Sequence, residues 1–169
     1  MANSLPVTGT SPYPHLVVPG TVSLSTMATI EDVARLVAEL PDVMTGERYG
    51  NRTWSVAGKA FAWDRPFSKA DVRRFGSTTP PEGPILAVRV ADLAEKEAVL
   101  ATSSQAVFTI PHFDGYAAVL IQLKSVKLPE LREAIVDAWL ACAPSPLAAA
   151  FLQHARRRDP GNDADAASH

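Results

Sequence analysis

Cysteine is nearly absent from this chain, with Cys142 standing alone among 169 residues. A single cysteine excludes an intrachain disulfide framework and a zinc cluster built from cysteines. The four histidines include no pair four residues apart, which is the spacing of a helical metal site. We therefore expect neither a metal nor another cofactor, and we expect a reducing, cytoplasmic environment.

Charge is absent from residues 1–26, which also hold four prolines. Their longest apolar run, residues 16–18, is too short for the centre of a signal peptide or for a membrane span. This composition cannot build a core, so we predict a disordered tail over 1–26 and a second one over 159–169. One domain is expected between them, over 27–158, without a membrane partner. Met27 precedes the first structured segment and is a candidate alternative start.

Basic residues are slightly fewer than acidic ones, and the formal net charge is -2. This balance argues against a protein whose whole surface has a positive potential. The segment from 46 to 75 nevertheless carries seven cations against three carboxylates, so it has a charge of +4 and the remainder -6. Such a segment can neutralise phosphates. The alternative is that these are ordinary solvated charges. The candidate DNA contacts are Arg48, Arg52, Lys59, Arg65, Lys69, Arg73 and Arg74.

A hairpin with aromatic side chains lies within this basic segment. Two runs with a period of two flank residues 57–58, which predicts a tight β-turn. The expected register places Trp54 opposite Phe61, and it leaves a second face of small residues, from Thr53 to Ala62, open to a partner. The covered face would hold Trp54, Val56, Phe61 and Trp63.

Short helices and strands are expected along the rest of the chain. Helix-capping pairs, Thr29 with Asp32 and Ser68 with Asp71, predict helices up to Pro41 and over 69–75. A third pair, Asp92 with Glu95, predicts a helix to about 101 that buries Leu93, Val99 and Leu100. Strands are predicted over 42–49 and 85–90. A helix over 129–143 would bury Leu131, Ile135, Ala138, Trp139 and Cys142, and a helix from Ser145 would turn Leu147, Ala150, Phe151 and His154 inward.

A second hairpin is expected around Asp114-Gly115. Pairing Phe113 with Tyr116 would put Phe108, Ile110, His112, Val119 and Ile121 on one core-facing row. His112 and Asp114 are also the one close histidine–carboxylate pair of the predicted domain, so they are the candidates for general-base chemistry or ligand binding. No nucleophile and no orienting third group accompany them, so we predict that the chain is not an enzyme.

The order and spacing of several short motifs resemble the MmcQ/YjbR-like family over roughly residues 27–151. The motifs include Arg48-Tyr49-Gly50 and the block from Thr109 to Tyr116. The residues that carry the resemblance include Trp54, Gly58, Phe61, Trp63, His112, Asp114, Gly115 and Tyr116.

The resemblance implies a two-layer α+β domain, a mostly antiparallel sheet with helices packed on it, similar in topology to type III secretion chaperones. It also implies DNA binding, since the family fold is described as a double wing. The alternative is a protein-interaction or chaperone-like module, or a homodimer, that uses a sheet edge without nucleic acid.

Overall fold

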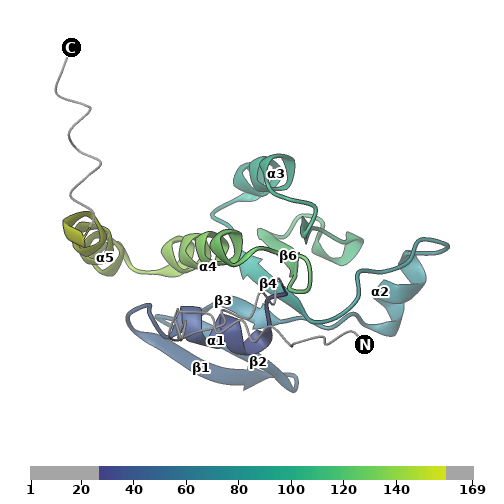
Figure 1. The fold of residues 1–169 in the computed structure, drawn as a ribbon, viewed down its shortest axis with the longest axis horizontal. Coiled ribbons are helices and arrows are strands. Elements are labelled where there is room, and N and C mark those ends of the chain that lie inside the picture. Colours follow the sequence, from purple (N-terminus) through teal and green to yellow (C-terminus); the bar gives the residue numbers. More distant parts are fainter. Residues whose placement is uncertain (1–26, 159–169) are drawn as a thin grey trace, which may run out of the picture.

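A computed structural model describes residues 27–158 of the chain, so the two predicted tails lie outside the described residues. Six strands form one antiparallel sheet with the order β1-β2-β3-β4-β6-β5 (Figure 1). The strands are β1 Val43–Arg48, β2 Asn51–Val56, β3 Lys59–Asp64, β4 Ile85–Arg89, β5 Val107–Phe108 and β6 Ala118–Gln122. The helices are α1 Ile30–Val37, α2 Lys69–Arg74, α3 Leu93–Thr102, α4 Leu128–Cys142 and α5 Ser145–Arg158, with a 3-10 turn η1 over Pro111–Phe113. The predicted α+β fold is confirmed.

The helix starts follow the capping signals of the sequence. Thr29 and Asp32 form a complete capping box at α1, and Ser68 and Asp71 form one at α2. Asp92 caps α3 by accepting a hydrogen bond from the backbone N–H of Glu95. Local side-chain chemistry therefore fixes where three of these helices begin.

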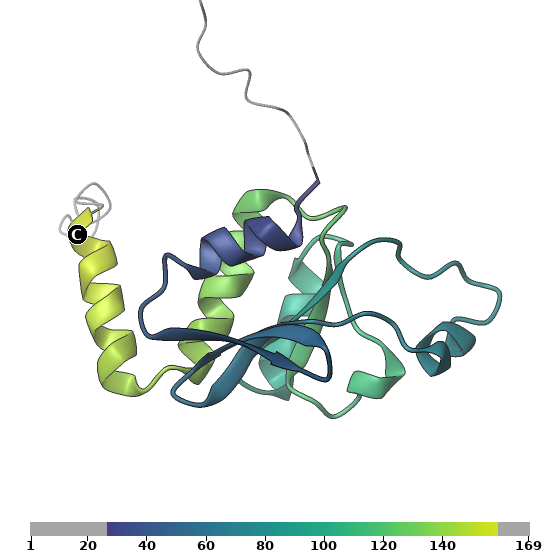
Figure 2. The same ribbon diagram turned by 90° about the horizontal axis from the view of Figure 1, so that it is seen from below.

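The main core lies between the sheet and the helices α1 and α4, which sit side by side in Figure 2, with α4 packed over β2, β3 and β4. The predicted apolar stripe of α4 is buried throughout, from Leu131 to Cys142. Trp139 of this stripe also donates a hydrogen bond from Nε1 to the carbonyl oxygen of Pro41, at 3.1 Å. This bond joins α4 to the connection between α1 and β1.

The opposite face of the sheet is covered unevenly. A second apolar cluster over β4 and β6 contains Ile85 and Leu120, against which Phe67 and Phe75 pack from either side of α2. β1 lies at the sheet edge and is exposed from Met44 to Arg48. The two ends of the molecule are formed by α2 and α5 (Figures 1 and 2).

The first hairpin has the predicted turn but not the predicted register. Ala57 and Gly58 both adopt positive φ angles, 49° and 77°, as a tight two-residue turn requires. A β-bulge follows, so Trp54 pairs with Ala62 instead of Phe61. The bulge turns Trp63 to the second face, where it packs with the smaller cluster. The prediction that all four large residues share one face is therefore wrong, as is the placement of Ala62, which is buried in the main core.

The second hairpin is interrupted by η1. β5 and β6 pair with Phe108 opposite Leu120, one residue away from the expected register. Phe108 and Ile110 therefore lie with the smaller cluster, away from Val119 and Ile121 in the main core. His112 is exposed on η1, so its predicted place at the end of a core-facing row is wrong.

The predicted inward residues of α3 and α5 are only partly correct, since Val99, Leu100, Leu147 and Phe151 pack against the main core and the others do not. Leu93 is 47% exposed, whereas Lys96 is 7% exposed and its ammonium group donates to the carbonyl oxygens of Phe113 and Tyr116. No residue of α5 is buried, and Ala150 and His154 are exposed. None of the helices within residues 27–158 has both the length and the apolar content to cross a membrane.

Candidate functional site

The seven cations of the predicted DNA site do not form one surface. Arg52 pairs with Glu31 of α1 at 3.2 Å, and Arg65 pairs with Asp71 of α2 at 2.9 Å. Arg74 lies 3.8 Å from the same Asp71. Three of the seven cations are thus paired within the protein, with two carboxylates between them.

Asp71 is the centre of a buried polar cluster between β3 and α2. Its Oδ2 accepts hydrogen bonds from the backbone N–H and the hydroxyl of Ser68 and from Arg65, each at 2.9 Å. Burial by itself raises the pKa of Asp71, but these hydrogen bonds and the charge of Arg65 outweigh it and hold the pKa below its usual value. Arg65 therefore has a structural role in anchoring α2.

The remaining cations are spread along the molecule. Arg48 stands beside the β1–β2 turn with its guanidinium over the ring of Tyr49, at 5.4 Å from the ring centroid. Lys59 follows the β2–β3 turn at the other end of β2, about 20 Å away for a six-residue strand. Lys69 and Arg73 are exposed on α2 and have no carboxylate partner within residues 27–158.

The second group of predicted residues forms a turn beneath α3. Asp114 and Gly115 occupy the centre of a type II turn, in which Gly115 has a φ of 72° and the N–H of Tyr116 donates to the carbonyl of Phe113. The ring of Tyr116 meets the edge of Trp63 and lies under the guanidinium of Arg89, at 4.9 Å.

His112 and Asp114 are both exposed, and His112 makes no side-chain hydrogen bond within the described residues. Residues 27–158 contain no group of three histidine, cysteine or acidic side chains placed to hold a metal ion. His112 and Asp114 therefore lie on a solvent-facing turn and do not form an assembled catalytic or ligand-binding site.

The β1 edge is a better-defined surface than the basic segment. Tyr49 and Gly50 form the β1–β2 turn with φ angles of 54° and 77°, and Arg48 pairs with Asn51 beside it. In such a hairpin the pair next to the turn is hydrogen-bonded, and bonded and non-bonded pairs then alternate. Val43, Thr45 and Glu47 therefore direct their backbone N–H and C=O groups away from β2, toward solvent.

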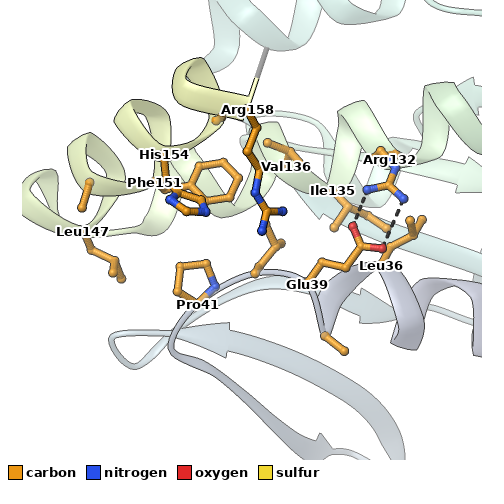
Figure 3. Close-up of a pocket in the computed structure, with 14 residues that line it drawn as sticks. Leu36, Glu39, Pro41, Arg132, Ile135, Val136, Leu147, Phe151, His154 and Arg158 are labelled. Carbon is orange, nitrogen blue, oxygen red and sulfur yellow. Dashed lines mark hydrogen bonds and ion pairs between the residues drawn. The ribbon is translucent and has the colours of Figure 1, made fainter. Parts of the chain in front are cut away.

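An open groove lies between α5 and the pair of helices α1 and α4 (Figure 3). It has a volume of about 860 Å³. The side chains that form its apolar floor are Leu36, Leu40, Ile135, Val136, Leu147 and Phe151. Phe151 packs against Trp139 with a centroid separation of 4.9 Å, which joins this floor to the core.

Charged side chains surround the groove. Arg132 of α4 holds Glu39 in a two-contact ion pair, while His154 and Arg158 line the groove from α5 (Figure 3). The ion pair holds the pKa of Glu39 below its usual value. Helical spacing predicts that Phe151 and His154 lie on a core-facing stripe, whereas both line this groove. The groove was missed because it depends on the angle between α4 and α5, which no periodicity indicates.

Comparisons with known proteins find relatives that align with three quarters of this chain. A search of protein-family models finds no match. The chain is 46% identical over 129 residues to the uncharacterised protein Rv2570 of Mycobacterium tuberculosis, covering 75% of this chain and 97% of the relative. It matches the uncharacterised protein Mb2600 of Mycobacterium bovis to the same extent.

Among solved structures, the Deinococcus radiodurans protein DR2400, described as a DUF419 domain, aligns with a TM-score of 0.47 and 16% identity. The alignment covers 86% of this chain and 97% of that one. At 46% identity across nearly the whole mycobacterial protein, the chain belongs to the same family as Rv2570 and Mb2600.

Proposed function

We propose that this protein is a non-enzymatic interaction module that binds a partner protein by adding a partner strand to β1. The observation that carries this proposal is the asymmetry of the sheet edges. β1 offers six residues, five of them exposed, whereas the other edge, β5, has two residues. Strand addition needs a row of free backbone groups, and within the described residues β1 alone is long enough to offer one.

The side chains of β1 suit this use. Met44 of β1 and Tyr49 of the adjoining turn are large hydrophobic residues with exposed fractions of 71% and 89%. Glu47 and Arg48 add one charge of each sign. Backbone hydrogen bonds would give affinity, and side chains on alternate faces of β1 would give selectivity.

Amide hydrogen exchange tests the proposal at single residues. Extended heptapeptides selected for binding to the full chain should protect the amides of Val43, Thr45 and Glu47, because these point away from β2. Met44 and Gly46 should show little change. Thr45→Pro removes one outward N–H and should abolish binding, while Thr45→Val keeps the strand and should preserve it. Uniform protection, or equal binding by both variants, would contradict strand addition.

DNA binding is a second candidate, favoured by Lys69 and Arg73, which are exposed on α2 at one end of the molecule and have no carboxylate partner among residues 27–158 (Figure 2). It also follows from the resemblance to the MmcQ/YjbR-like family, which remains a prediction. The argument against DNA binding is electrostatic, because acidic side chains repel the phosphates of DNA. A cleft between α3 and α4 contains Glu95, Glu133 and Asp137, and burial together with these glutamates raises the pKa of Asp137.

A salt titration of duplex DNA binding tests this second candidate. A phosphate-dominated complex should weaken steeply as salt rises, and the double change Arg73→Glu with Arg74→Glu should abolish it. Absence of binding at low salt would exclude DNA and leave the strand-binding proposal untouched.

A further inference from the structure

We propose that the groove between α5 and the helices α1 and α4 binds an amphipathic helix of a partner protein that carries acidic side chains beside its apolar stripe. This site is separate from the β1 edge and does not depend on the function proposed above.

The size and lining of the groove fit a helix. Its volume of about 860 Å³ is at the upper end of the range for binding pockets, and most of the side chains that line it are apolar. α5 has 14 residues and is therefore about 21 Å long, whereas three anchor residues at i, i+4 and i+7 span about 10 Å of a bound helix. Two turns of a partner helix can thus lie along α5.

The floor of the groove is held in place by the core. Leu147 and Phe151 of α5 are partly buried against the main core, and Phe151 rests on Trp139, which is fully buried. Leu36 of α1 and Ile135 of α4 complete the opposite wall. A preformed apolar floor reduces the ordering cost of binding.

The charges around the groove identify the partner's chemistry. Arg132 is balanced by Glu39, but Arg158 has no acidic partner within residues 27–158. Arg156 and Arg157 follow His154 on the same helix, so the end of α5 carries three arginines. The positive charge of the three arginines exceeds the negative partial charge, about half an elementary charge, that the helix dipole places at this end. Acidic side chains flanking an apolar stripe complement such a rim.

A displayed library of helical peptides provides the probe. Leucine is fixed at i, i+4 and i+7, the neighbouring positions are randomised, and peptides are selected on the full-length protein. Aspartate and glutamate should be enriched at the randomised positions. Ala150→Glu places a carboxylate in the groove and should weaken binding of selected peptides by about tenfold or more. Ala149→Glu is the matched control, because Ala149 is exposed on α5 outside the groove, and it should leave binding unchanged.

A second pair of variants tests the charge argument by itself. Arg158→Glu should weaken binding by about fivefold or more, while Arg157→Glu makes the same charge change outside the groove and should have a much smaller effect. Circular dichroism melting curves check that each variant folds.

Three results of the peptide experiments would overturn the proposal. These are enrichment of neutral or basic flanks, failure to enrich any peptide, and equal loss of binding in both members of a pair. Self-association that is abolished by Ala150→Glu would also overturn it, because a second copy of the chain would then occupy the groove.

Discussion

Replacing Asp71 by asparagine should lower the free energy of unfolding by about 2 to 3 kcal/mol. The carboxylate is buried and accepts three hydrogen bonds, from the backbone and hydroxyl of Ser68 and from Arg65. An asparagine can still accept a hydrogen bond but cannot balance the charge of Arg65. Breaking a fully buried ion pair costs ~3–5 kcal/mol, and the loss here is smaller because the side chain of Arg65 remains 18% exposed.

Asp32 provides a matched control in the same kind of capping box. It accepts hydrogen bonds from the backbone and hydroxyl of Thr29, but its cationic partner, Arg35, is 74% exposed. Asp32→Asn should therefore cost only about 1 kcal/mol. Urea unfolding followed by circular dichroism measures both variants. Equal losses would refute the argument that the buried pair with Arg65 stabilises α2.

The pH dependence of the Asp71 effect has a definite sign. Because its folded pKa is depressed, Asp71 contributes fully above the usual aspartate pKa of about 3.9, and the contribution is lost as the pH falls through the lower folded value. The stability difference between the wild type and Asp71→Asn should therefore narrow in acid. A difference that stays constant down to acid unfolding would contradict the depressed pKa.

Three further predictions concern single side chains. Ala57→Gly should stabilise the protein by about 1 kcal/mol in thermal unfolding, because Ala57 has a φ of 49°, and a destabilised variant would contradict the observed turn. Lys96→Met should cost about 2 kcal/mol in urea unfolding and speed the exchange of the Tyr116 amide, because a buried and a partly buried carbonyl oxygen lose their donor; unchanged stability would contradict this role. Glu39→Gln should leave the urea unfolding midpoint nearly unchanged, because both partners of the Glu39–Arg132 pair are more than half exposed, and a marked fall in the midpoint would show a structural role for the pair.

The parts of the fold that the sequence predicted are those with local causes. The capping boxes depend on residues three apart, the turn at 57–58 on two adjacent residues, and the buried stripe of α4 on spacing within one helix. The bulge before Phe61 and the 3-10 turn at 111–113 were missed, because packing against other elements decides them.

Prediction of the binding surfaces was limited by contacts between distant residues. The partner of Arg52 is 21 residues away, and Glu39 and Arg132 are 93 residues apart. A charge count along the chain treats these arginines as free. The exposure of β1, by contrast, depends on its place in the sheet order, which no property of residues 43–48 reveals.

The unequal sheet edges also limit how far edge-mediated association can extend. If two copies joined through β1, the new ends of the combined sheet would both be β5, which has two residues. A strand this short offers too few backbone groups to recruit another chain. Association through β1 would therefore stop at two subunits. Filament growth needs a free binding surface at each end of the assembly, so it would be blocked.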